Sequence, residues 1–302
     1  MLHSSNISTL EVSRNTANYF ARIAPDLGKV WELQENNTAE VVAFLSIRPV
    51  HTVIMASFIN DNGIVSKLNR GKFYGYRNAQ GKIEGVALIG HSTLVEAHTD
   101  AALKALAVIG KASDTPIHLI MSSGEDAQTF WNYLSDGRTK PRLTCVERLF
   151  EAAFPFAVQG KDSGLRLASA GELLQIAEAQ AQVAFVESGV DPMLKDRDGF
   201  LRRVARRIEQ GRIHVVFDGD KLVFKADIIA ETDDVAYLEG VFVGPDYQGK
   251  GLGAKCLSAL TVELLSRVSH VCLLSNEAFK SAHRSFEKAG FRSSDQCTTI
   301  FV

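Results

Sequence analysis

The sequence predicts an α/β (α+β) protein that is built from two tandem domains. The chain has 302 residues, which is more than one hydrophobic core usually organises. Short apolar runs of strand type alternate with segments in which apolar residues recur every three or four positions, so strands and helices are interleaved. The same order of hairpin, strand, helix, strand and helix occurs twice along the chain. These three observations together predict the two-domain plan.

Composition limits the classes of partner. The chain is 46% hydrophobic and 23% charged, with a formal net charge of −2, which is ordinary for a globular protein. A charge this close to zero gives no general attraction for nucleic acid or for an anionic membrane. No apolar run is long enough to span a bilayer, and the first residues lack a signal-peptide pattern. We therefore expect a cytoplasmic monomer or homodimer with no nucleic-acid or membrane partner.

The cysteines and histidines predict no metal site. Cys145, Cys256, Cys272 and Cys297 show no Cys-x-x-Cys spacing, and all but Cys297 lie in apolar surroundings. Buried free thiols in a reducing compartment are the expected state. No cluster of His, Cys and Asp has the spacing of metal ligands, so the metal prediction is none.

The first part of the chain predicts an N-terminal extension and a first domain. The extension is residues 1–38, with one weak helix around Thr16 to Ile23, and the domain is residues 39–155. Its expected elements are a hairpin of strands 72–77 and 82–90, a strand at 93–96, a helix at 100–111, a strand at 117–122 and a helix at 125–134. A linker is expected near residues 154–163.

The second domain is predicted to span residues 164–302. Its first elements are a strand at 165–168, an Ala-rich helix at 171–188, a helix capped by Asp198 that runs to Gln210, and a hairpin of strands 213–217 and 221–229 around an Asp-Gly turn. On the Ala-rich helix the predicted buried side consists of Leu173, Leu174, Ala177, Ala181 and Phe185.

The most informative stretch is a strand, a glycine-rich loop and a helix. The strand is Glu239–Val243, the loop carries glycines at 249, 251 and 253, and the following helix has a buried face of Leu257, Leu260, Thr261, Leu264, Leu265 and Val268. Glycines let successive backbone N–H groups turn toward one anion. The helix N-terminus adds unpaired N–H groups and the positive end of its dipole. The stretch therefore predicts a site for a diphosphate group.

Two common diphosphate motifs do not fit this loop. A P-loop ends in Lys-Ser/Thr, whereas Gly253 is followed by Ala254, Lys255 and Cys256, so no hydroxyl is placed for magnesium. A dinucleotide fingerprint needs Gly-x-Gly-x-x-Gly early in a βαβ unit, and this pattern comes late in the chain.

The loop resembles the acetyl-CoA pyrophosphate loop of the GNAT acetyltransferases, in which Gln248, Gly251 and Gly253 fill the fixed positions. The strand at 270–276, the helix at 277–289 that Gly290 ends, and the strand at 298–302 complete the order of a GNAT C-terminal half. From about residue 40 the chain resembles a group of bacterial two-domain GNAT proteins, in the segments 58–63, 69–75, 187–192 and 223–227. The resemblance implies two GNAT-like domains, each a mixed, mostly antiparallel sheet flanked by helices.

The resemblance implies that the second domain binds one acetyl-CoA, which is used as a cosubstrate. The implied contacts are Val241, Phe242, Val243, Gln248, Gly249, Lys250, Gly251, Leu252, Gly253, Ala254, Asn276 and Ala282. In the first domain the strand-to-helix junction Ala97–Asp100 has no glycine loop, so that domain is expected to be degenerate and to lack a CoA site. An unrelated α/β domain ahead of one GNAT domain is the alternative.

Glu239 is the candidate general base. It lies two residues before Val241, which on an extended strand puts both on one face. A carboxylate beside a low-dielectric cleft can accept a proton from an amine, directly or through water, with a pKa that desolvation raises. Lys225 and Asp227 either pair in the cleft or lie on the wetter face of the sheet. Arg202, Arg203, Arg206 and Arg207 form either a solvated helix face or a border for an acidic acceptor.

The last helix departs from the family pattern. Asn276 and Ala282 match, but Phe279 and Phe286 stand where the family often has Asn and a Tyr that assists the leaving sulfur. The leading prediction is an acetyl-CoA-dependent N-acetyltransferase that acts on an amine of a small molecule or a protein by direct attack in a ternary complex. The alternative is a non-catalytic acyl-CoA-binding or scaffold protein. A third reading is a different acyl or aminoacyl transfer on the same tandem fold.

Overall fold

The computed structural model describes residues 25–156 and 163–302. The helix expected at Thr16 to Ile23 and the centre of the expected linker lie outside the described residues. The chain divides into two units. Of the described residues, unit 1 contains 25–47, Asp61–Cys145 and Thr298–Val302, and unit 2 contains Arg48–Asn60, 146–156 and 163–297.

Unit 1 is built on a sheet in the order β1-β2-β3-β4-β5, with the C-terminal end of β12 next to β5. The strands are β1 Val30–Glu32, β2 Gly71–Arg77, β3 Ile83–Gly90, β4 Ser92–Ala97, β5 Leu119–Ser123 and β12 Arg292–Phe301. The helices are α2 Thr38–Leu45, α4 Asp100–Lys111 and α5 Asp126–Leu134, with short 3₁₀ turns at Leu27–Lys29, Glu35–Asn37 and Lys67–Asn69. The apolar faces of α4 and α5 pack on the sheet around Leu106 and Phe130.

Unit 2 has a sheet in the order β6-β11-β10-β9-β8-β7. The strands are β6 Leu143–Ala153, β7 Arg166–Leu167, β8 Ile213–Asp218, β9 Lys221–Glu231, β10 Val235–Val243 and β11 His270–Asn276. The helices are α3 Pro49–Asn62, α6 Leu173–Ser188, α7 Pro192–Lys195, α8 Arg197–Glu209, α9 Leu252–Leu265 and α10 Lys280–Lys288, with 3₁₀ turns at Ala170–Glu172 and Pro245–Tyr247.

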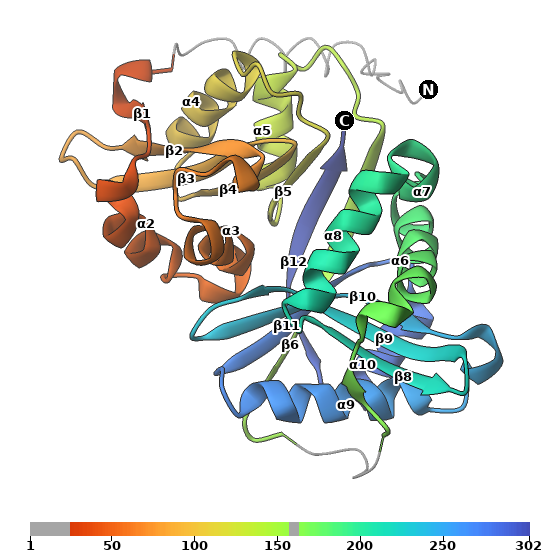
Figure 1. The fold of residues 1–302 in the computed structure, drawn as a ribbon. Coiled ribbons are helices and arrows are strands. Elements are labelled where there is room, and N and C mark those ends of the chain that lie inside the picture. Colours follow the sequence, from red (N-terminus) through yellow and green to blue (C-terminus); the bar gives the residue numbers. More distant parts are fainter. Residues whose placement is uncertain (1–24, 157–162) are drawn as a thin grey trace, which may run out of the picture. The chain divides into compact units, whose positions relative to one another are not determined.

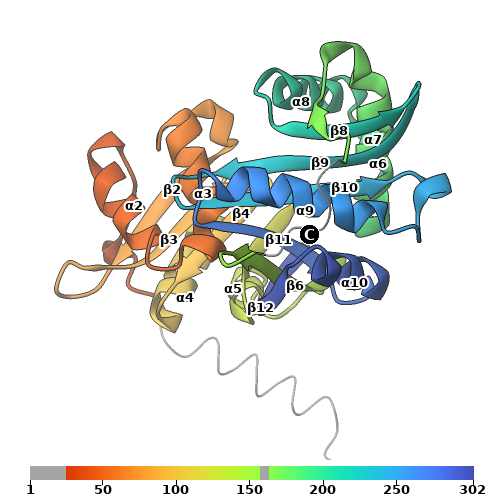
Figure 2. The ribbon, with the colours of Figure 1, turned by 90° about the horizontal axis from the view of Figure 1, so that it is seen from below.

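Helices cover both faces of the unit 2 sheet (Figure 1, Figure 2). The helices α9 and α10 pack on the face that carries Phe224, Leu238 and Leu273. The opposite face packs against α6 and α8 through Ile213 and Val215 of β8. Each fully buried leucine or phenylalanine contributes about 1.5–3 kcal/mol, so each face of the sheet holds its own core. The predicted buried face of α9 is confirmed.

Both units repeat one strand pattern. Among the pairings of the described strands within each unit, β4 with β5 and β10 with β11 are parallel, and those of the hairpin strands before them are antiparallel. In each unit a helix, α4 or α9, connects the two parallel strands. The predicted mixed, mostly antiparallel sheet flanked by helices is therefore confirmed.

Two expectations for the helices of unit 2 were wrong. On α6, Ala177 and Ala181 of the predicted side are buried together with Ile176 and Ala179, whereas Leu174 and Phe185 are 52% and 56% exposed. The small alanine side chains let this helix lie close to the sheet, which turns the larger residues outward. The N-cap of α8 is Asp196, which accepts from the Gly199 amide, and Asp198 lies in the first turn.

The units divide the chain differently from the predicted domains 39–155 and 164–302. Residues 147–153 of β6 pair along β11 within unit 2, and Arg48–Asn60 also belongs to unit 2. In unit 1, Thr298 donates its hydroxyl to the Gly124 carbonyl, and Arg142 donates its amide to the Phe301 carbonyl. Contiguous segments are the default in sequence reasoning, whereas strand pairing here joins segments from opposite ends of the chain.

Candidate functional site

The central feature of unit 2 is an opening between β10 and β11. The two strands pair in parallel from Val235–His270 to Leu238–Leu273, and no further register pair joins them within the described residues. Directly after this point β10 contains a bulge, because Glu239 lies opposite Asp227 whereas Phe242 lies opposite Lys225. Beyond Leu238 the edge of β10 is therefore separated from its parallel neighbour.

The bulge depends on Gly240. Its φ is +59°, in the left-handed region that side chains disfavour. A Cβ at this position would also collide with Gln180 Oε1 and Lys225 Nζ. The extra residue reverses the alternation of β10, so Val241 packs toward α9 and α10. The prediction that Glu239 and Val241 share one face is therefore wrong, because it assumed a regular strand.

A buried charged cluster lies beside the bulge, on the face covered by α6 and α8. Lys225 and Asp227 are 0% and 1% exposed, and Lys225 Nζ lies 2.6 Å from Asp227 Oδ1. Arg207 of α8 donates to Asp227 Oδ2 at 2.9 Å. Lys225 Nζ also donates to Gln180 Oε1 at 2.5 Å and to the Gly240 carbonyl at 3.1 Å. Lys225 and Asp227 were expected either to pair with each other or to lie on the wetter face of the sheet, and the structure shows the ion pair.

The four arginines of α8 separate into two groups. Arg202, Arg203 and Arg206 are exposed, and Arg203 lies 3.5 Å from Asp196. Arg207 alone of the four reaches the buried cluster.

The charge state of the cluster depends on its burial. Burial lowers the pKa of Lys225, and the charge of Asp227 opposes that shift.

A cavity of about 320 Å³ occupies the opening between the strands. Glu239, Val241 and Phe242 of β10 line it together with Leu273, Leu274 and Ser275 of β11. Gln182, Val183, Val186 and Glu187 of α6 line it from one face of the sheet, and Phe279, Ala282 and Phe286 line it from the α10 side. Because helices from both faces contribute, the cavity can take two reactants from opposite sides of the sheet.

Glu239 is held in this cavity by Tyr237. The Tyr237 hydroxyl donates to Glu239 Oε1 at 3.0 Å. Burial raises the pKa of the Glu239 carboxyl, while the Tyr237 hydrogen bond and the charge of Arg207 lower it in part. The carboxyl is thus a partly buried base with a raised pKa inside a cavity that has apolar walls.

Glu187 is a second carboxylate of the same cavity that sequence reasoning did not select. The protein packed around it raises the pKa of its carboxyl, and the charges of Glu239 and Glu147 add to that rise. Its side chain is nevertheless exposed to solvent at the rim, and contact with water limits the shift. The only signal for Glu187 in the sequence was that it lies in the segment 187–192, which resembles the two-domain GNAT proteins.

The glycine loop forms an open cradle at the start of α9. Gly249 and Gly251 have φ values of +73° and +79°, and space is open around both Cα atoms. Gly251 is the N-cap of α9 and supplies no side-chain hydrogen bond, so the first-turn amides have no cap of their own. Lys250, Leu252 and Lys255 line an adjoining cavity of about 280 Å³. These features fit an anionic diphosphate.

Other predicted loop residues brace the strand and the helix. Gln248 donates its side-chain amide to the Val243 carbonyl at 3.0 Å and also lines the cavity of the opening. A Cβ on Gly253 would lie 2.8 Å from Val243 Cγ2, so glycine lets α9 approach β10 closely. Ala254 is buried in the core on the α9 side. The strand and loop residues of the predicted set thus surround one edge of the opening.

The two predicted residues near α10 differ in position. Ala282 lines the cavity. The Asn276 side chain accepts from the Ala278 amide at 2.9 Å, and the Asn276 carbonyl lies 3.0 Å from Nε2 of the buried His283. Asn276 therefore shapes the turn that leads into α10.

Phe279 and Phe286, which stand where the GNAT pattern often has Asn and Tyr, both line the cavity. Phe286 is 7% exposed and packs edge-on against Phe150, with ring centroids 5.5 Å apart. Its ring is thus both core and cavity wall. Neither phenylalanine carries a proton that a leaving thiolate can take.

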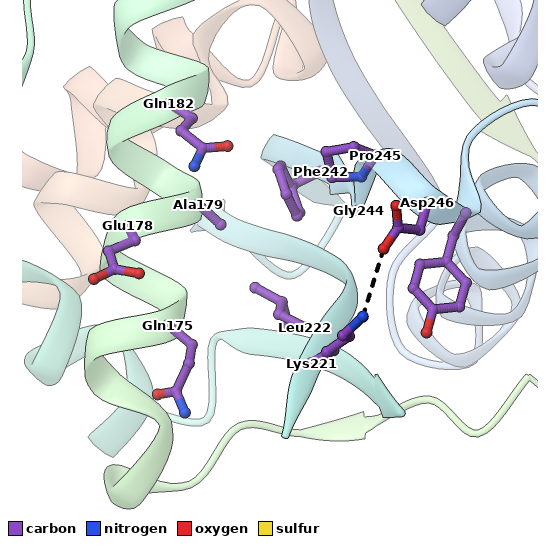
Figure 3. A pocket seen from close by; sticks show the side chains of 11 residues that line it. Gln175, Glu178, Ala179, Gln182, Lys221, Leu222, Phe242, Gly244, Pro245 and Asp246 are labelled. Atoms are coloured by element: carbon purple, nitrogen blue, oxygen red, sulfur yellow. Dashed lines mark ion pairs between the residues drawn. The ribbon is translucent and has the colours of Figure 1, made fainter. Parts of the chain in front are cut away.

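A second cavity of about 260 Å³ adjoins the first and shares Gln182, Phe242 and Pro245 with it. Figure 3 shows Gln175, Glu178 and Gln182 along α6, across from Phe242 and Pro245. Lys221 and Asp246 form an ion pair of 3.6 Å at its far side. Phe242 thus lies between the two cavities and lines both.

The corresponding junction in unit 1 is closed by a side chain. Thr99 is the N-cap of α4, and its hydroxyl accepts from the Ala102 amide at 3.3 Å. The α4 terminus thus has an internal side-chain cap in the place where the α9 terminus has bare glycines.

The described part of the chain holds neither a cluster of metal ligands nor a membrane-spanning helix. No group of three or more His, Cys, Asp or Glu side chains that can hold a metal ion occurs in residues 25–156 and 163–302. Within the same residues, no helix has the length and apolar character needed to cross a bilayer. All four cysteines are free and buried.

One family model matches a part of unit 2. Residues 209–293 match the family model described as the acetyltransferase (GNAT) domain, a range that contains the bulge, the glycine loop and most of the cavity. No curated protein matches the chain significantly.

Solved structures share the fold over most of the chain. A GNAT-family acetyltransferase from Colwellia psychrerythraea has a TM-score of 0.56 at 13% identity, over 90% of this chain and 99% of its own. A Drosophila protein has a TM-score of 0.64 at 11% identity, over 91% and 98%. A tandem GNAT protein from the clavulanic acid biosynthesis pathway has a TM-score of 0.52 at 10% identity, over 90% and 97%. Identities this low concern the fold alone.

Proposed function

We propose that this chain, which carries a GNAT acetyltransferase domain, is an acetyl-CoA-dependent N-acetyltransferase. The acceptor is an amine of a small molecule or a protein, and it attacks the acetyl group directly in a ternary complex. The observation that carries the proposal is the β10–β11 opening, which adjoins the glycine cradle of α9 and holds Glu239 within its cavity. A diphosphate cradle, a channel and a base are the parts that amine acetylation needs.

Acetyl-CoA supplies the activated acetyl thioester. The uncapped amides at Gly251, Leu252 and Gly253 bind its diphosphate, and Lys250 and Lys255 add positive charge beside them. The free edge of β10 at Val241 and Val243 offers backbone groups to the extended arm of the cosubstrate. Gln248 keeps the loop against that strand through its bond to the Val243 carbonyl.

Glu239 takes the proton of the acceptor ammonium. Its pKa is raised by burial, which brings its basicity closer to that of the amine than an exposed carboxylate would be. Tyr237 orients the carboxyl through its hydrogen bond. Glu187 at the rim gives the acceptor a second negative charge near solvent.

The test is calorimetry of the full chain with acetyl-CoA, followed by thiol release against a panel of primary amines. Binding together with amine-dependent thiol release supports the proposal. Binding without thiol release on any amine of the panel supports the alternative function. Failure to bind acetyl-CoA contradicts both functions.

The alternative is a non-catalytic acyl-CoA-binding or scaffold protein, and one observation favours it. Phe286 is buried against Phe150 at the cavity wall, at the position where the related family often has a tyrosine hydroxyl that assists the leaving sulfur. Introduction of Tyr at this position separates the readings. A higher turnover at unchanged acetyl-CoA affinity in the Phe286→Tyr variant indicates an enzyme that lacks only its acid.

The remaining parts of the proposal concern the setting of the protein. Reduced buried cysteines and a near-neutral net charge suit a cytoplasmic protein without nucleic-acid or membrane partners. A monomer and a homodimer are both compatible with the site, since the lining residues of the cavity come from unit 2.

A further inference from the structure

The buried ammonium of Lys225 is not used by the proposed chemistry, yet it lies at the most unusual point of the sheet. Its side chain is 0% exposed. Burial of an ammonium group is costly unless several partners replace its hydration. Three oxygen partners surround Lys225 Nζ: Asp227 Oδ1 at 2.6 Å, Gln180 Oε1 at 2.5 Å and the Gly240 carbonyl at 3.1 Å.

The negative charge of Asp227 alone does not explain why a second cation, Lys225, is buried beside it. Asp227 already receives a charged hydrogen bond from Arg207 at 2.9 Å. The contact that ties Lys225 to the bulge is the one to the carbonyl of Gly240, the residue that stands at positive φ there. Gln180 of α6 and Asp227 of β9 hold the ammonium from two sides and point its third contact at that carbonyl.

The geometry of one peptide group connects this contact to the opening. The Gly240–Val241 peptide is trans, so its C=O and N–H point in opposite directions. Lys225 holds the carbonyl toward the α6 face. The Val241 amide consequently points away from α6, and β11 offers it no ladder partner because parallel pairing ends at Leu238–Leu273.

We propose that Lys225 is a positioning residue, whose ammonium fixes the Gly240–Val241 peptide so that the Val241 amide donates to the thioester carbonyl of bound acetyl-CoA. The inference rests on the proposed use of acetyl-CoA and adds a residue from a different strand to the site. Asp227, Gln180 and Arg207 hold Lys225 in place. None of these four side chains lines the cavity, so each acts through the peptide.

The test compares Lys225→Met with Lys225→Gln in the full chain. Methionine keeps the length of the side chain and removes all its donors, whereas glutamine keeps an N–H donor for the Gly240 carbonyl without a charge. Three readouts are measured: the exchange rate of the Val241 amide without ligand, the affinities for acetyl-CoA and for CoA, and the turnover with an amine.

In Lys225→Met we expect faster exchange of the Val241 amide and loss of any preference for acetyl-CoA over CoA. Turnover should fall about tenfold or more, since a misdirected donor loses part of its stabilisation of the developing oxyanion. The affinity for CoA itself should stay unchanged, because the glycine cradle is intact. Lys225→Gln should recover a measurable part of each loss.

Leu264→Ala is the matched control for a loss of stability. Leu264 is buried in the last turn of α9, in the core on the side of the sheet opposite α6, and does not line the cavity. The variant should lower the unfolding temperature and leave the exchange of the Val241 amide and the acetyl-CoA preference as in the wild type. Wild-type exchange and preference in Lys225→Met, or the same losses in Leu264→Ala, would overturn the proposal.

The proposal and the proposed function can fail separately. If the wild-type chain binds neither acetyl-CoA nor CoA, the proposed function is wrong. The exchange of the Val241 amide in the ligand-free variants still decides whether Lys225 fixes the bulge. If the wild type binds and turns over while the variants match it, only the role of Lys225 is wrong.

Discussion

Glu239 is the residue on which the chemistry depends most. We expect Glu239→Gln to lower kcat roughly 100- to 10,000-fold, because a positioned base contributes that range, with little change in acetyl-CoA affinity. In the wild type a base must be ionised, so activity should rise with pH through the raised pKa of Glu239 and be lost below it. The pH profile of kcat/KM checks this. A variant that keeps wild-type activity and the same acidic limb would show that another group is the base.

Individual residues show how much of the candidate site could be predicted from the sequence. Glycine spacing and helical periodicity predicted the glycine loop and the buried face of α9, because both patterns have direct physical meanings, and the resemblance to the GNAT strand led to Glu239 as a candidate. The face of Val241 was missed, although a lone glycine inside a strand is a recognised signal of a bulge. Glu187 could not be selected, since its position in the cavity depends on how α6 packs on the sheet.

At the scale of elements, the glycine loop couples α9 to β10. Gly253→Ala places a methyl group 2.8 Å from Val243 Cγ2, and overpacking of this kind costs about 1–3 kcal/mol. We expect a lower melting temperature and weaker acetyl-CoA binding, because the start of α9 must move from the strand. Gly171→Ala is the matched control, since its Cβ meets nothing within 4 Å. Equal effects in both variants would mean that the close approach is unimportant.

The start of α6 gives a prediction for stability against pH. Glu172 belongs to a capping box with Ser169, and a hydrogen bond from Arg166 is the largest cause that lowers its pKa from 4.5 to about 2. A lowered folded-state pKa means that the stabilisation is present above pH 4.5 and is lost as the pH falls toward 2. We expect Glu172→Gln to cost about 1 kcal/mol near neutral pH. In urea titrations the difference from wild type should vanish near pH 2; a constant difference would contradict this origin.

At the scale of the whole molecule, the chain exchanges segments between its two units. Residues 147–153 pair with the full length of β11, and Arg48–Asn60 contributes Val53 to the core around Tyr237. A fragment of residues 164–302 lacks both segments and exposes the edge of β11, which favours aggregation. We expect it to show no cooperative thermal transition and no acetyl-CoA binding. A stable, monomeric fragment with full-chain affinity would refute this.

The same scale shows the limit of prediction from one sequence. Two similar sheets were expected because hairpins and helices recur in the same order. The exchange of segments was not, since pairing between distant strands leaves no local signal in composition or periodicity. β6 is an 11-residue strand for which no element was predicted, although it completes the sheet beside the candidate site.

Binding of acetyl-CoA in the β10–β11 opening and the α9 cradle underlies every functional proposal for this chain. It is tested by isothermal calorimetry of the full chain with acetyl-CoA, for the wild type beside Gly251→Val. A branched side chain at a φ of +79° is strained and fills the cradle. We expect saturable one-to-one binding by the wild type and its loss in Gly251→Val. No binding by the wild type, or equal binding by the variant, would show that the site does not hold acetyl-CoA.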